Sequence, residues 1–225
     1  NIAFIIIGTI LPITAAILIN EVRSRRASKI YQTLVLLPFL MSWVVVSYLS
    51  YTFLSTDTGL LNSVLQALGY EKINWYASEK YWPFILTFVN IWKGTGYSMI
   101  VYLASIVSIG QDYYEAASID GATKWQCIKS ITLPLLKPTV IVLLILSMGR
   151  IFASDFGLFY QVTQNAGALY PTTETIDVYV YNALMNNGDF GMSSAASVFQ
   201  SLVGFVLVII TNTIVRKTNK ENALF

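Results

Sequence analysis

The sequence EAASIDGATKWQCIKSITLP, residues 115–134, is polar and carries both signs of charge, yet it lies between two long apolar runs. The residues from Tyr113 to Ile119 suit a short helix, in which Ala116 and Ala117 let another surface approach closely. Gly121 then allows the backbone to turn at low steric cost. Such a bent helix pair is suited to a groove on a partner protein, and a solvated loop with incidental helicity is the alternative.

The second half of this stretch predicts another helix, over residues 122–131. One edge of that helix is apolar and consists of Trp125, Ile128 and Ile131. We expect Leu133 and Pro134 to end it, because proline lacks the backbone N–H that a helix interior requires. Pro138 would then begin the next apolar run.

The composition is that of a membrane protein. Of the 225 residues, 55% are hydrophobic and only 12% are charged, whereas soluble domains carry about 25% charged residues. The sequence has no histidine, the usual proton switch and zinc ligand, and the single Cys127 excludes an internal disulfide. The net charge of +2 does not point to nucleic acid, because the basic residues lie where membrane topology would place them.

Five apolar runs are long enough, at about 18 residues or more, to cross a hydrocarbon core of about 30 Å. They extend over residues 2–19, 31–53, 82–109, 138–159 and 192–215. These runs predict an all-α polytopic membrane protein with about five spans. Because the chain opens inside an apolar run, without Met or a basic lead-in, we expect a sixth helix upstream, and a true external N-terminus is the alternative.

The basic residues predict the orientation of these runs, since Lys and Arg in short loops mark the cytoplasmic side of a membrane. Three basic segments fall on one side if all five runs span, and they contain Arg23, Arg25, Arg26 and Lys29, then Lys124, Lys129 and Lys137, and finally Arg216, Lys217 and Lys220. Residues 110–138 and the C-terminus are therefore expected in the cytoplasm. Residues 55–81 and 160–191 are expected outside the cell.

The outer segments are expected to have structure of their own. Residues 59–69 repeat apolar side chains at the spacing of a short amphipathic helix that lies at the membrane interface. Aromatic residues that suit an interfacial belt follow it, namely Trp75, Tyr76, Tyr81 and Trp82. Residues 175–181 fit either an extended stretch or a short helix.

The spacing within residues 115–134 matches a family motif. Glu-Ala-Ala, three residues, Gly121, nine residues, Ile131, one residue and Leu133-Pro134 resemble, at every defining position, the EAA motif of binding-protein-dependent ABC import permeases. Four segments are similar to the carbohydrate-uptake branch of that family, the polysaccharide-type permeases related to the maltose system's membrane subunits: PFLMSW at 38–43, IWK at 91–93, IDGA at 119–122 and LPLLKP at 133–138. The resemblance covers essentially the whole chain.

This resemblance implies a type I ABC importer permease fold, with residues 1–225 as a single transmembrane domain. It implies that the EAA segment is a coupling helix seated in a cleft of a cytoplasmic ATPase subunit. Closure of two such subunits on ATP would switch the spans between inward- and outward-facing states. The residues implied in this coupling are Glu115, Ala116, Ala117, Asp120, Gly121, Ile131, Leu133 and Pro134.

The resemblance also implies the partners and the location of the chain. It points to a second homologous permease subunit, an extracellular solute-binding protein and the plasma membrane of a bacterium. The sequence has no G-x-x-x-x-G-K-[ST] phosphate loop, so we expect no enzyme activity and no bound cofactor or metal, with ATP and magnesium on the partner ATPase. The nearest glycine pair, Gly94 and Gly96, lies in the third apolar run and is expected to permit close helix packing.

Two cations lie deep in apolar runs. Lys93 is about halfway along the third, and Arg150 is similarly deep in the fourth, with Asp155 roughly a turn and a half further on. A cation at the centre of a span costs about 2.5–3.5 kcal/mol, and such residues usually face a bundle interior or a wet cavity. We expect these residues in the translocation path, beside aromatic rings that can stack on sugars, namely Trp43, Trp92, Phe156, Tyr179 and Tyr181.

A structural role is the alternative for the two cations. Lys93 or Arg150 would then pair with Asp155 or cap a broken helix. If both cations line the cavity instead, the hypothesis is that the cargo is an acidic saccharide such as a uronic-acid oligomer.

Other functions would need different signatures. An intramembrane hydrolase would need a nucleophile with a base, or paired carboxylates, and Asp155 is the only acid near mid-membrane. An ion-coupled secondary transporter would have no need of a docking helix. An ABC importer for a non-sugar solute, such as an amino acid or a metal, is the nearest alternative to sugar import.

Overall fold

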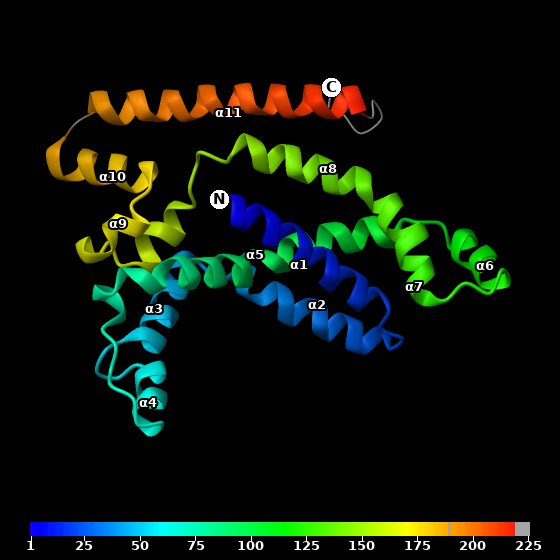
Figure 1. Cartoon of the computed structure of the whole chain (residues 1–225), viewed down its shortest axis with the longest axis horizontal. Helices are drawn as coiled ribbons and strands as arrows, with labels where there is room; N and C mark the ends of the chain where they lie inside the picture. Colours follow the sequence, from blue (N-terminus) through cyan, green and yellow to red (C-terminus); the bar gives the residue numbers. More distant parts are fainter. Residues whose placement is uncertain (189, 219–225) are drawn as a thin grey trace. The chain divides into compact units, whose positions relative to one another are not determined.

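The computed structural model describes residues 1–188 and 190–218, and every regular element in these ranges is helical (Figure 1), which confirms the all-α prediction. The chain forms two compact units that are described separately. The first contains residues 1–39, 91–151 and the described residues from 204 onward, and the second contains residues 40–90 and 152–203. Two long helices, α5 (Trp82–Val107) and α11 (Phe190–Thr218), contribute one part to each unit.

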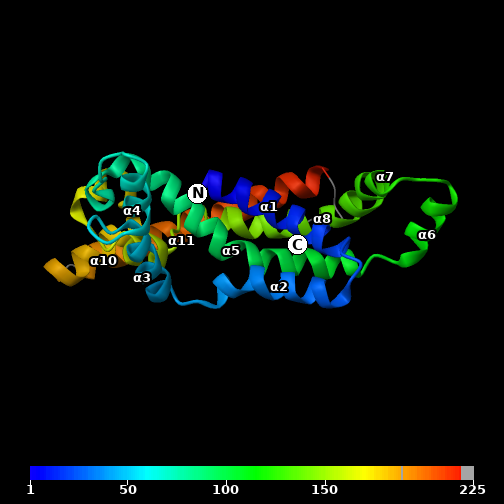
Figure 2. The ribbon, with the colours of Figure 1, turned by 90° about the horizontal axis from the view of Figure 1, so that it is seen from below.

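In the first unit the helices pack around one apolar core. Its elements are α1 (Ile2–Asn20), α2 (Arg25–Leu40), the later part of α5, α6 (Gln111–Ile119), α7 (Lys124–Cys127), the π-helical turn η3 (Ile128–Thr132), α8 (Leu133–Gly149) and the later part of α11. Figures 1 and 2 show α1, α2 and α5 side by side. The buried core side chains are Ala16, Ile19, Met99, Tyr102, Leu103, Ile106 and Leu136.

The second unit is built from shorter helices. Its elements are α3 (Trp43–Leu54), α4 (Leu60–Ala67), the 3₁₀ turns η1 (Trp75–Ala77) and η2 (Glu79–Tyr81), the early part of α5, the π-helical η4 (Gly157–Val162), the 3₁₀ turn η5 (Gly167–Leu169), α9 (Tyr170–Thr173), α10 (Ile176–Asn187) and the early part of α11. The main packing in this unit is between α3 and η4. Leu158 and Val162 of η4 and Val46 of α3 are buried there.

Several described helices can cross a membrane. Three stretches are long and apolar enough, Ile2–Asn20, Lys124–Gly149 and Phe190–Lys217, and α2 with α3 meets the same test as a fourth when the two are taken together. With its 26 residues, α5 is about 39 Å long at about 1.5 Å per residue. It does not reach the same mean hydropathy, since polar residues such as Asn90 and Lys93 interrupt it.

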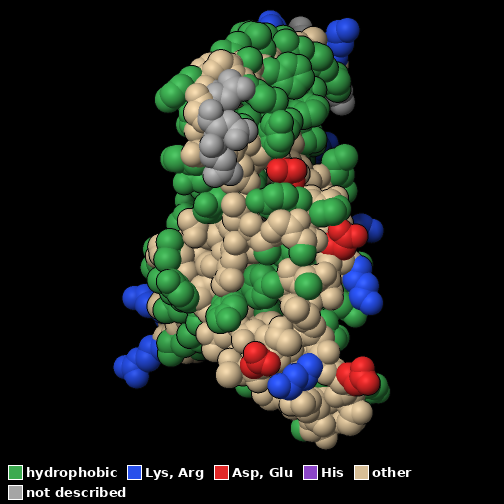
Figure 3. Space-filling view, turned by 90° about the vertical axis from the view of Figure 1, so that its left-hand side faces the viewer, with side chains coloured by type: hydrophobic (Ala, Val, Ile, Leu, Met, Phe, Trp, Pro, Cys, Tyr) green, Lys and Arg blue, Asp and Glu red, His purple; other side chains and the backbone are tan. Residues whose placement is uncertain are grey.

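Many large hydrophobic side chains are exposed, and Figure 3 shows such side chains, in green, over a substantial part of one face of the molecule. Phe190, Phe199 and Phe205 of α11, for example, are all exposed. A soluble monomer rarely exposes so much contiguous apolar surface. The surface therefore agrees with the membrane protein that the composition predicts.

The predicted run over residues 31–53 is not one helix, which corrects the sequence interpretation. The helix α2 ends at Leu40 and α3 begins at Trp43. Ser42 causes the new start, because its Oγ accepts a hydrogen bond from the backbone N–H of Val45 at 3.3 Å. Pro38 in the last turn of α2 further weakens helical continuity at this point.

The prediction that Leu133 and Pro134 end the helix is also wrong. The helix that begins at Lys124 continues through η3 and α8 to Gly149. The π-turn directly before Leu133 replaces the tighter α-helical bonding where Pro134 has no N–H to offer. Pro138 lies inside α8 and does not restart the chain.

The predicted run over residues 138–159 is likewise interrupted, since α8 ends at Gly149 and η4 begins at Gly157. Asp155 starts the second helix, because its Oδ1 accepts the N–H groups of Gly157 at 3.0 Å and Leu158 at 3.3 Å. Glycine is a weak helix former, which favours the end at Gly149. Arg150 therefore lies at a helix end and not in the middle of a continuous helix.

The outer segment contains the predicted amphipathic helix, α4, and the 175–181 alternative is resolved as the helix α10. Trp82 departs from the interfacial belt, because it is fully buried and its Nε1 donates to the carbonyl of Trp75 at 2.8 Å. Tyr76 packs against the Trp82 ring, and burial, with a smaller contribution from Tyr51, raises the pKa of the Tyr76 phenol.

The two glycines of α5 behave differently. A Cβ on Gly96 would lie 2.3 Å from the carbonyl oxygen of Val35, so the predicted close packing of helices is confirmed there. A Cβ on Gly94 would meet nothing within 4 Å, so no described part of this chain packs closely on Gly94.

Candidate functional site

The EAA segment of the first unit is a bent pair of helices. The first, α6, ends at Ile119, and Gly121 follows with φ +77°, in the left-handed region that glycine adopts without strain. The next helix starts with a capping box, in which Thr123 and Gln126 each bond the other's backbone N–H. The bend at Gly121 is therefore encoded locally, on both of its sides.

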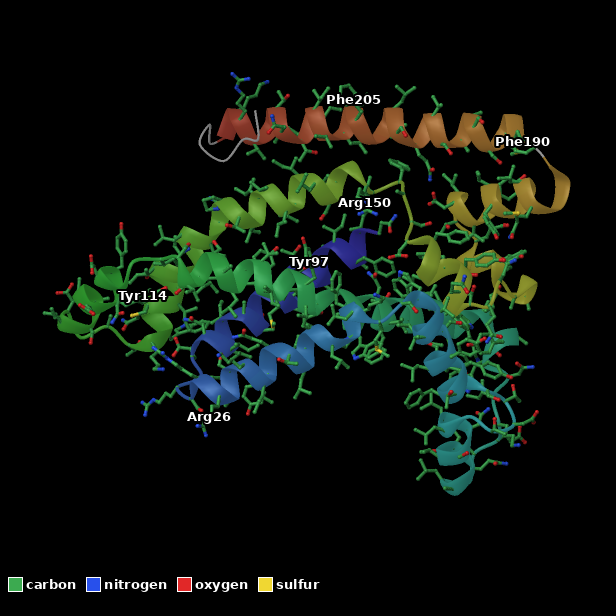
Figure 4. The ribbon with its side chains drawn as sticks, turned by 180° about the vertical axis from the view of Figure 1, so that it is seen from behind. Arg26, Tyr97, Tyr114, Arg150, Phe190 and Phe205 are labelled. Atoms are coloured by element: carbon green, nitrogen blue, oxygen red, sulfur yellow. The ribbon has the colours of Figure 1, made fainter. Side chains whose placement is uncertain are left out.

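Two contacts fix this segment to the first unit. The hydroxyl of Tyr114 lies 3.0 Å from that of Thr132, which joins α6 to η3 (Tyr114 is labelled in Figure 4). Lys124 forms an ion pair with Glu21 at the end of α1. Both partners in that pair are partly exposed, so the pair orients the segment more than it stabilises the fold.

The outward side of the EAA segment is unusually apolar. The side chains of Ile119 and Trp125 are 87% and 68% exposed. Of the eight predicted coupling residues, six are exposed (Glu115, Ala116, Asp120, Gly121, Leu133 and Pro134) and two are half-buried (Ala117 and Ile131). The predicted edge of Trp125, Ile128 and Ile131 divides, since both isoleucines turn partly inward while Trp125 projects outward.

Lys93 in α5 caps the C-terminal end of α2. Its Nζ donates to the carbonyl oxygen of Phe39 at 3.1 Å and lies 5.5 Å from the centre of the Phe39 ring. The Phe39 ring stacks on that of Tyr97, with 5.0 Å between centroids and 22° between planes. Lys93 thus caps a broken helix, as the structural alternative predicted, and it also places a cation beside two aromatic rings.

The other two predicted path residues of the first unit, Trp92 and Arg150, have exposed side chains. Trp92 is exposed on α5, and Arg150 is exposed where α8 ends (Figure 4). Trp43, Asp155, Phe156, Tyr179 and Tyr181 belong to the second unit. A single path lined by both sets of residues stays a prediction.

In the second unit, three aromatic rings form one cluster. The Phe156 ring stacks on Tyr160 with 4.7 Å between centroids, and Tyr181 lies 4.8 Å from Phe156 and 4.9 Å from Tyr160. Trp43 packs on the backbone of Gly157, because a Cβ at Gly157 would lie 2.0 Å from the indole Cδ1. Tyr179 is exposed and is not part of this cluster.

A polar network holds the non-helical segment that precedes Asp155. Asp177 Oδ2 accepts the backbone N–H of Ser154 at 2.7 Å and its hydroxyl at 2.6 Å. Gln200 Nε2 donates to the carbonyl of Phe152 at 3.0 Å and to Asp177 Oδ1 at 3.3 Å. These side chains supply the partners that an interrupted helix leaves unsatisfied at membrane depth.

A cleft of about 640 Å³ lies beside this network and the aromatic cluster. Its walls are mainly apolar, with the rings and aliphatic side chains of Phe156, Val180, Tyr181, Leu184, Phe190 and Val198, and they also carry the Asp177 carboxylate and the hydroxyls of Ser193, Ser194 and Ser197. A cleft with mainly apolar walls and a few polar groups has the general character of a small-molecule binding site.

Sequence reasoning missed several of these residues. Tyr97 and Tyr160 each lie four residues after a predicted path residue, so the i, i+4 spacing of a helix could have found them. Phe39, Asp177 and Gln200 meet their partners only through the tertiary fold, and no local pattern indicates them. Residues 1–188 and 190–218 hold no cluster of three or more His, Cys, Asp or Glu suited to a metal.

Comparison with known proteins identifies the family. Residues 8–220 match the model of the binding-protein-dependent transport system inner membrane component. The chain belongs to this family. Membership confirms the resemblance that the EAA spacing indicated and makes the chain a membrane component of an ABC transporter.

The chain is similar in sequence to transport permeases of known name. It is 38% identical, over 93% of its length, to the polygalacturonan/rhamnogalacturonan transport system permease protein YteP of Bacillus subtilis. It is 34% identical, over 89% of its length, to the trehalose/maltose transport system permease protein MalF of Thermococcus litoralis. The chain spans 65% of the length of each of these two relatives.

The permease fold is also shared with a solved structure. A chain of a bacterial ABC transporter involved in the import of the acidic polysaccharide alginate superimposes with a TM-score of 0.88 at 36% identity. The match covers 95% of this permease and 74% of that chain. The type I importer permease architecture that the EAA resemblance implied is therefore supported by a structure.

Proposed function

We propose that this chain is the membrane-spanning permease subunit of an ATP-driven importer that moves a sugar or oligosaccharide into a bacterial cell. The observation that carries the proposal is the EAA segment, a Gly121-bent helix pair whose Ile119 and Trp125 are exposed. Exposed apolar side chains on a rigid bend suit a cleft on an ATPase subunit. Energy for transport would come from that subunit, with its ATP and magnesium.

Each coupling residue has a role in this proposal. Glu115 and Asp120 offer charges to the ATPase cleft, Ala116 and Ala117 allow close packing, and Gly121 sets the bend. The residues Ile131, Leu133 and Pro134 lie on the helix that continues toward the membrane. ATP-driven closure of two ATPase subunits would move this continuous helix as one body, and the spans would alternate their access.

The complete importer would contain further proteins. We propose a second homologous permease, two ATPase subunits and an extracellular solute-binding protein. The alginate transporter was solved in complex with an alginate pentasaccharide-bound periplasmic protein, which supports the last of these. We propose the plasma membrane as the location and the cytoplasm as the side of the C-terminus, and the terminal basic residue Lys220 lies outside the described residues.

We further propose that the cargo is acidic. Lys93 stands beside the stacked rings of Phe39 and Tyr97, so a carboxylate and a sugar face could be bound together. Arg150 is exposed at a helix end and would supply the second cation. The names of two relatives, which refer to polygalacturonan and to the acidic polysaccharide alginate, support a uronic-acid oligomer as cargo.

The test is uptake by proteoliposomes that contain the complete transporter, with trigalacturonate and neutral maltotriose as cargo. Lys93→Met with Arg150→Met should lower trigalacturonate uptake by about tenfold or more, because each charge-assisted hydrogen bond that is lost contributes about 1.5–3 kcal/mol. Lys72→Met, which removes an outer cation paired with Asp57, is the matched control. Unchanged trigalacturonate uptake in the double variant would show that Lys93 and Arg150 do not recognise a carboxylate, and the argument for an acidic cargo from these two cations would be wrong.

A further inference from the structure

A second, smaller cavity of the second unit lies between α3 and η4; none of the predicted path residues lines it, although its Tyr160 wall stacks on Phe156. Its volume is about 250 Å³. The side chains that line it are mostly amides, hydroxyls and rings, and include Ser47, Tyr48, Tyr160, Gln161, Gln164 and Asn165. Drug-sized pockets measure about 300–1,000 Å³, so this cavity suits one sugar unit and not a whole oligosaccharide.

Hydrogen bonds hold the walls of the cavity in place. Ser47 Oγ donates to the carbonyl of Gln161 at 2.5 Å, which joins α3 to η4. The amides of Asn165 and Asn182 bond each other reciprocally, both at 3.1 Å. Tyr170 donates to Asn165 Oδ1 at 3.0 Å. The cavity is therefore a built feature of the fold and does not depend on one mobile side chain.

The turn after η4 has a demanding backbone. Gln164 and Asn165 have φ values of +53° and +48°, in the left-handed region that non-glycine residues rarely adopt. The amide pair of Asn165 holds this turn, and as a result Gln164 is presented at the cavity. Such a conformation persists only where the surroundings over-determine it.

The two glutamines have unused hydrogen-bonding capacity. Across residues 1–188 and 190–218, the hydrogen bonds of the structure do not engage the side-chain amide of Gln161 or of Gln164. Each amide offers two donors and an acceptor, which matches neighbouring hydroxyl groups. Tyr48, whose side chain is 70% exposed, and Tyr160 add aromatic surface beside them.

We propose that this cavity is an outer saccharide subsite, in which Gln161 and Gln164 bond the hydroxyls of one pyranose unit and Tyr48 packs on its apolar face. The described lining side chains are all uncharged, so the subsite recognises hydroxyls and accepts neutral and acidic units equally. This separates it from Lys93, which would recognise only a carboxylate. The saccharide class rests on the proposed function, whereas the amide-and-ring chemistry rests on the cavity itself.

The experiment measures binding and uptake with the same proteins. Isothermal titration of the purified transporter with maltotriose and with trigalacturonate gives affinities, and proteoliposomes give KM for ATP-driven uptake. The variants are Gln161→Ala with Gln164→Ala, and Tyr48→Ala with Tyr48→Phe as the ring-retaining partner. Matched controls come from exposed residues of the same unit outside the cavity, Gln66→Ala and Tyr70→Ala.

We expect the double glutamine variant to weaken binding and raise KM by about thirtyfold for both sugars, with kcat unchanged, since two hydrogen bonds of about 1 kcal/mol each are lost. Tyr48→Ala should weaken sugar binding about threefold to tenfold, whereas Tyr48→Phe, which keeps the ring, should bind sugar as the unaltered protein does. Gln66→Ala and Tyr70→Ala should match the unaltered protein. Thermal unfolding and the yield of the intact complex confirm that each variant is folded.

The outcomes separate the subsite from the proposed function. If the double glutamine variant binds both sugars as well as Gln66→Ala does, the subsite is overturned, while normal ATP-driven uptake leaves the import function standing. If binding falls as expected but the unaltered transporter accumulates neither sugar, the subsite stands and saccharide import is wrong. A loss confined to trigalacturonate would also overturn the subsite, because its lining carries no charge.

Discussion

The outer segment, residues 55–81, and the EAA segment, residues 110–138, are both polar interruptions with short helices, but they are held in opposite ways. In the outer segment Asn62 is 1% exposed and makes five hydrogen bonds, because its Nδ2 donates to the carbonyls of Ser55, Thr56 and Ile73 and its Oδ1 accepts from Ile73 N–H and Trp75 Nε1. In the EAA segment Ile119 and Trp125 project outward. The outer segment forms its hydrogen bonds internally, whereas the EAA segment leaves apolar surface exposed that a partner could cover.

This difference shows that a short polar segment between apolar runs can either form a rigid structure of its own or present a surface to a partner protein. A buried side-chain amide whose hydrogen bonds are all formed holds several backbone segments together. A glycine bend sets the angle between two helices but leaves the apolar side chains beside it exposed. The two segments even share a matched feature, since Gly69 and Gly121 have φ values of +84° and +77° and open space around them. Substitutions at paired positions can therefore test the comparison directly.

The largest effect is expected from Gly121→Pro. Proline fixes φ near −65°, which is incompatible with the left-handed bend, so the helix pair loses its shape. ATP-driven uptake should fall about a hundredfold or more, equivalent to about 3 kcal/mol of coupling. The measurement is initial uptake rate together with recovery of the ATPase subunit.

Gly69→Pro is the matched control in the outer segment and should strain its turn equally. It should retain the ATPase subunit on purification. Equal loss of the ATPase in both variants would show that the docking role is not specific to the EAA segment.

Asn62→Ala should give the next largest effect, on stability. It leaves Ile73 N–H and Trp75 Nε1 without their acceptor in a buried place, so we expect a loss of about 2–4 kcal/mol in unfolding free energy. Thermal unfolding and protease cleavage within residues 55–81 report it. The exposed Asn74→Ala serves as control, and a stable Asn62→Ala protein would contradict the rigid outer segment.

The smallest effect on the fold is expected from Ile119→Ser with Trp125→Ala. Both side chains are exposed, so stability should change by less than about 0.5 kcal/mol. Affinity for the ATPase subunit should nevertheless fall about tenfold or more, because anchors of this kind dominate interfaces. Titration of the purified subunit against the permease in nanodiscs measures it. Undiminished affinity would mean that another surface docks the ATPase.

Much of the fold could be predicted from local pattern. The apolar runs predicted the helices α1 and α11 closely, and Gly121 predicted the bend, because these features depend on composition and on one residue's conformational freedom. The breaks at Ser42 and Arg150 escaped prediction. They depend on capping by Ser42 and Asp155, which hydropathy does not record within a long apolar run.

The site was predictable only in part. The EAA spacing and the depth of Lys93 were visible in the sequence, whereas the rings beside Lys93 come from another helix. Asp177 and Gln200 bond the non-helical segment before Asp155. Their partners Ser154 and Phe152 lie 23 and 48 residues away in the sequence. No periodicity connects such residues, so the structure was needed to bring them together.

The most direct test of the central claim is purification of the tagged protein from its native membrane in mild detergent, followed by reconstitution. The account predicts that an ATPase subunit copurifies, that Gly121→Pro loses it, and that trigalacturonate accumulates in the vesicles only when ATP is supplied to the ATPase. If the chain instead purifies alone and moves the sugar with an ion gradient and no ATP, the EAA segment is not a coupling helix and the importer account is wrong.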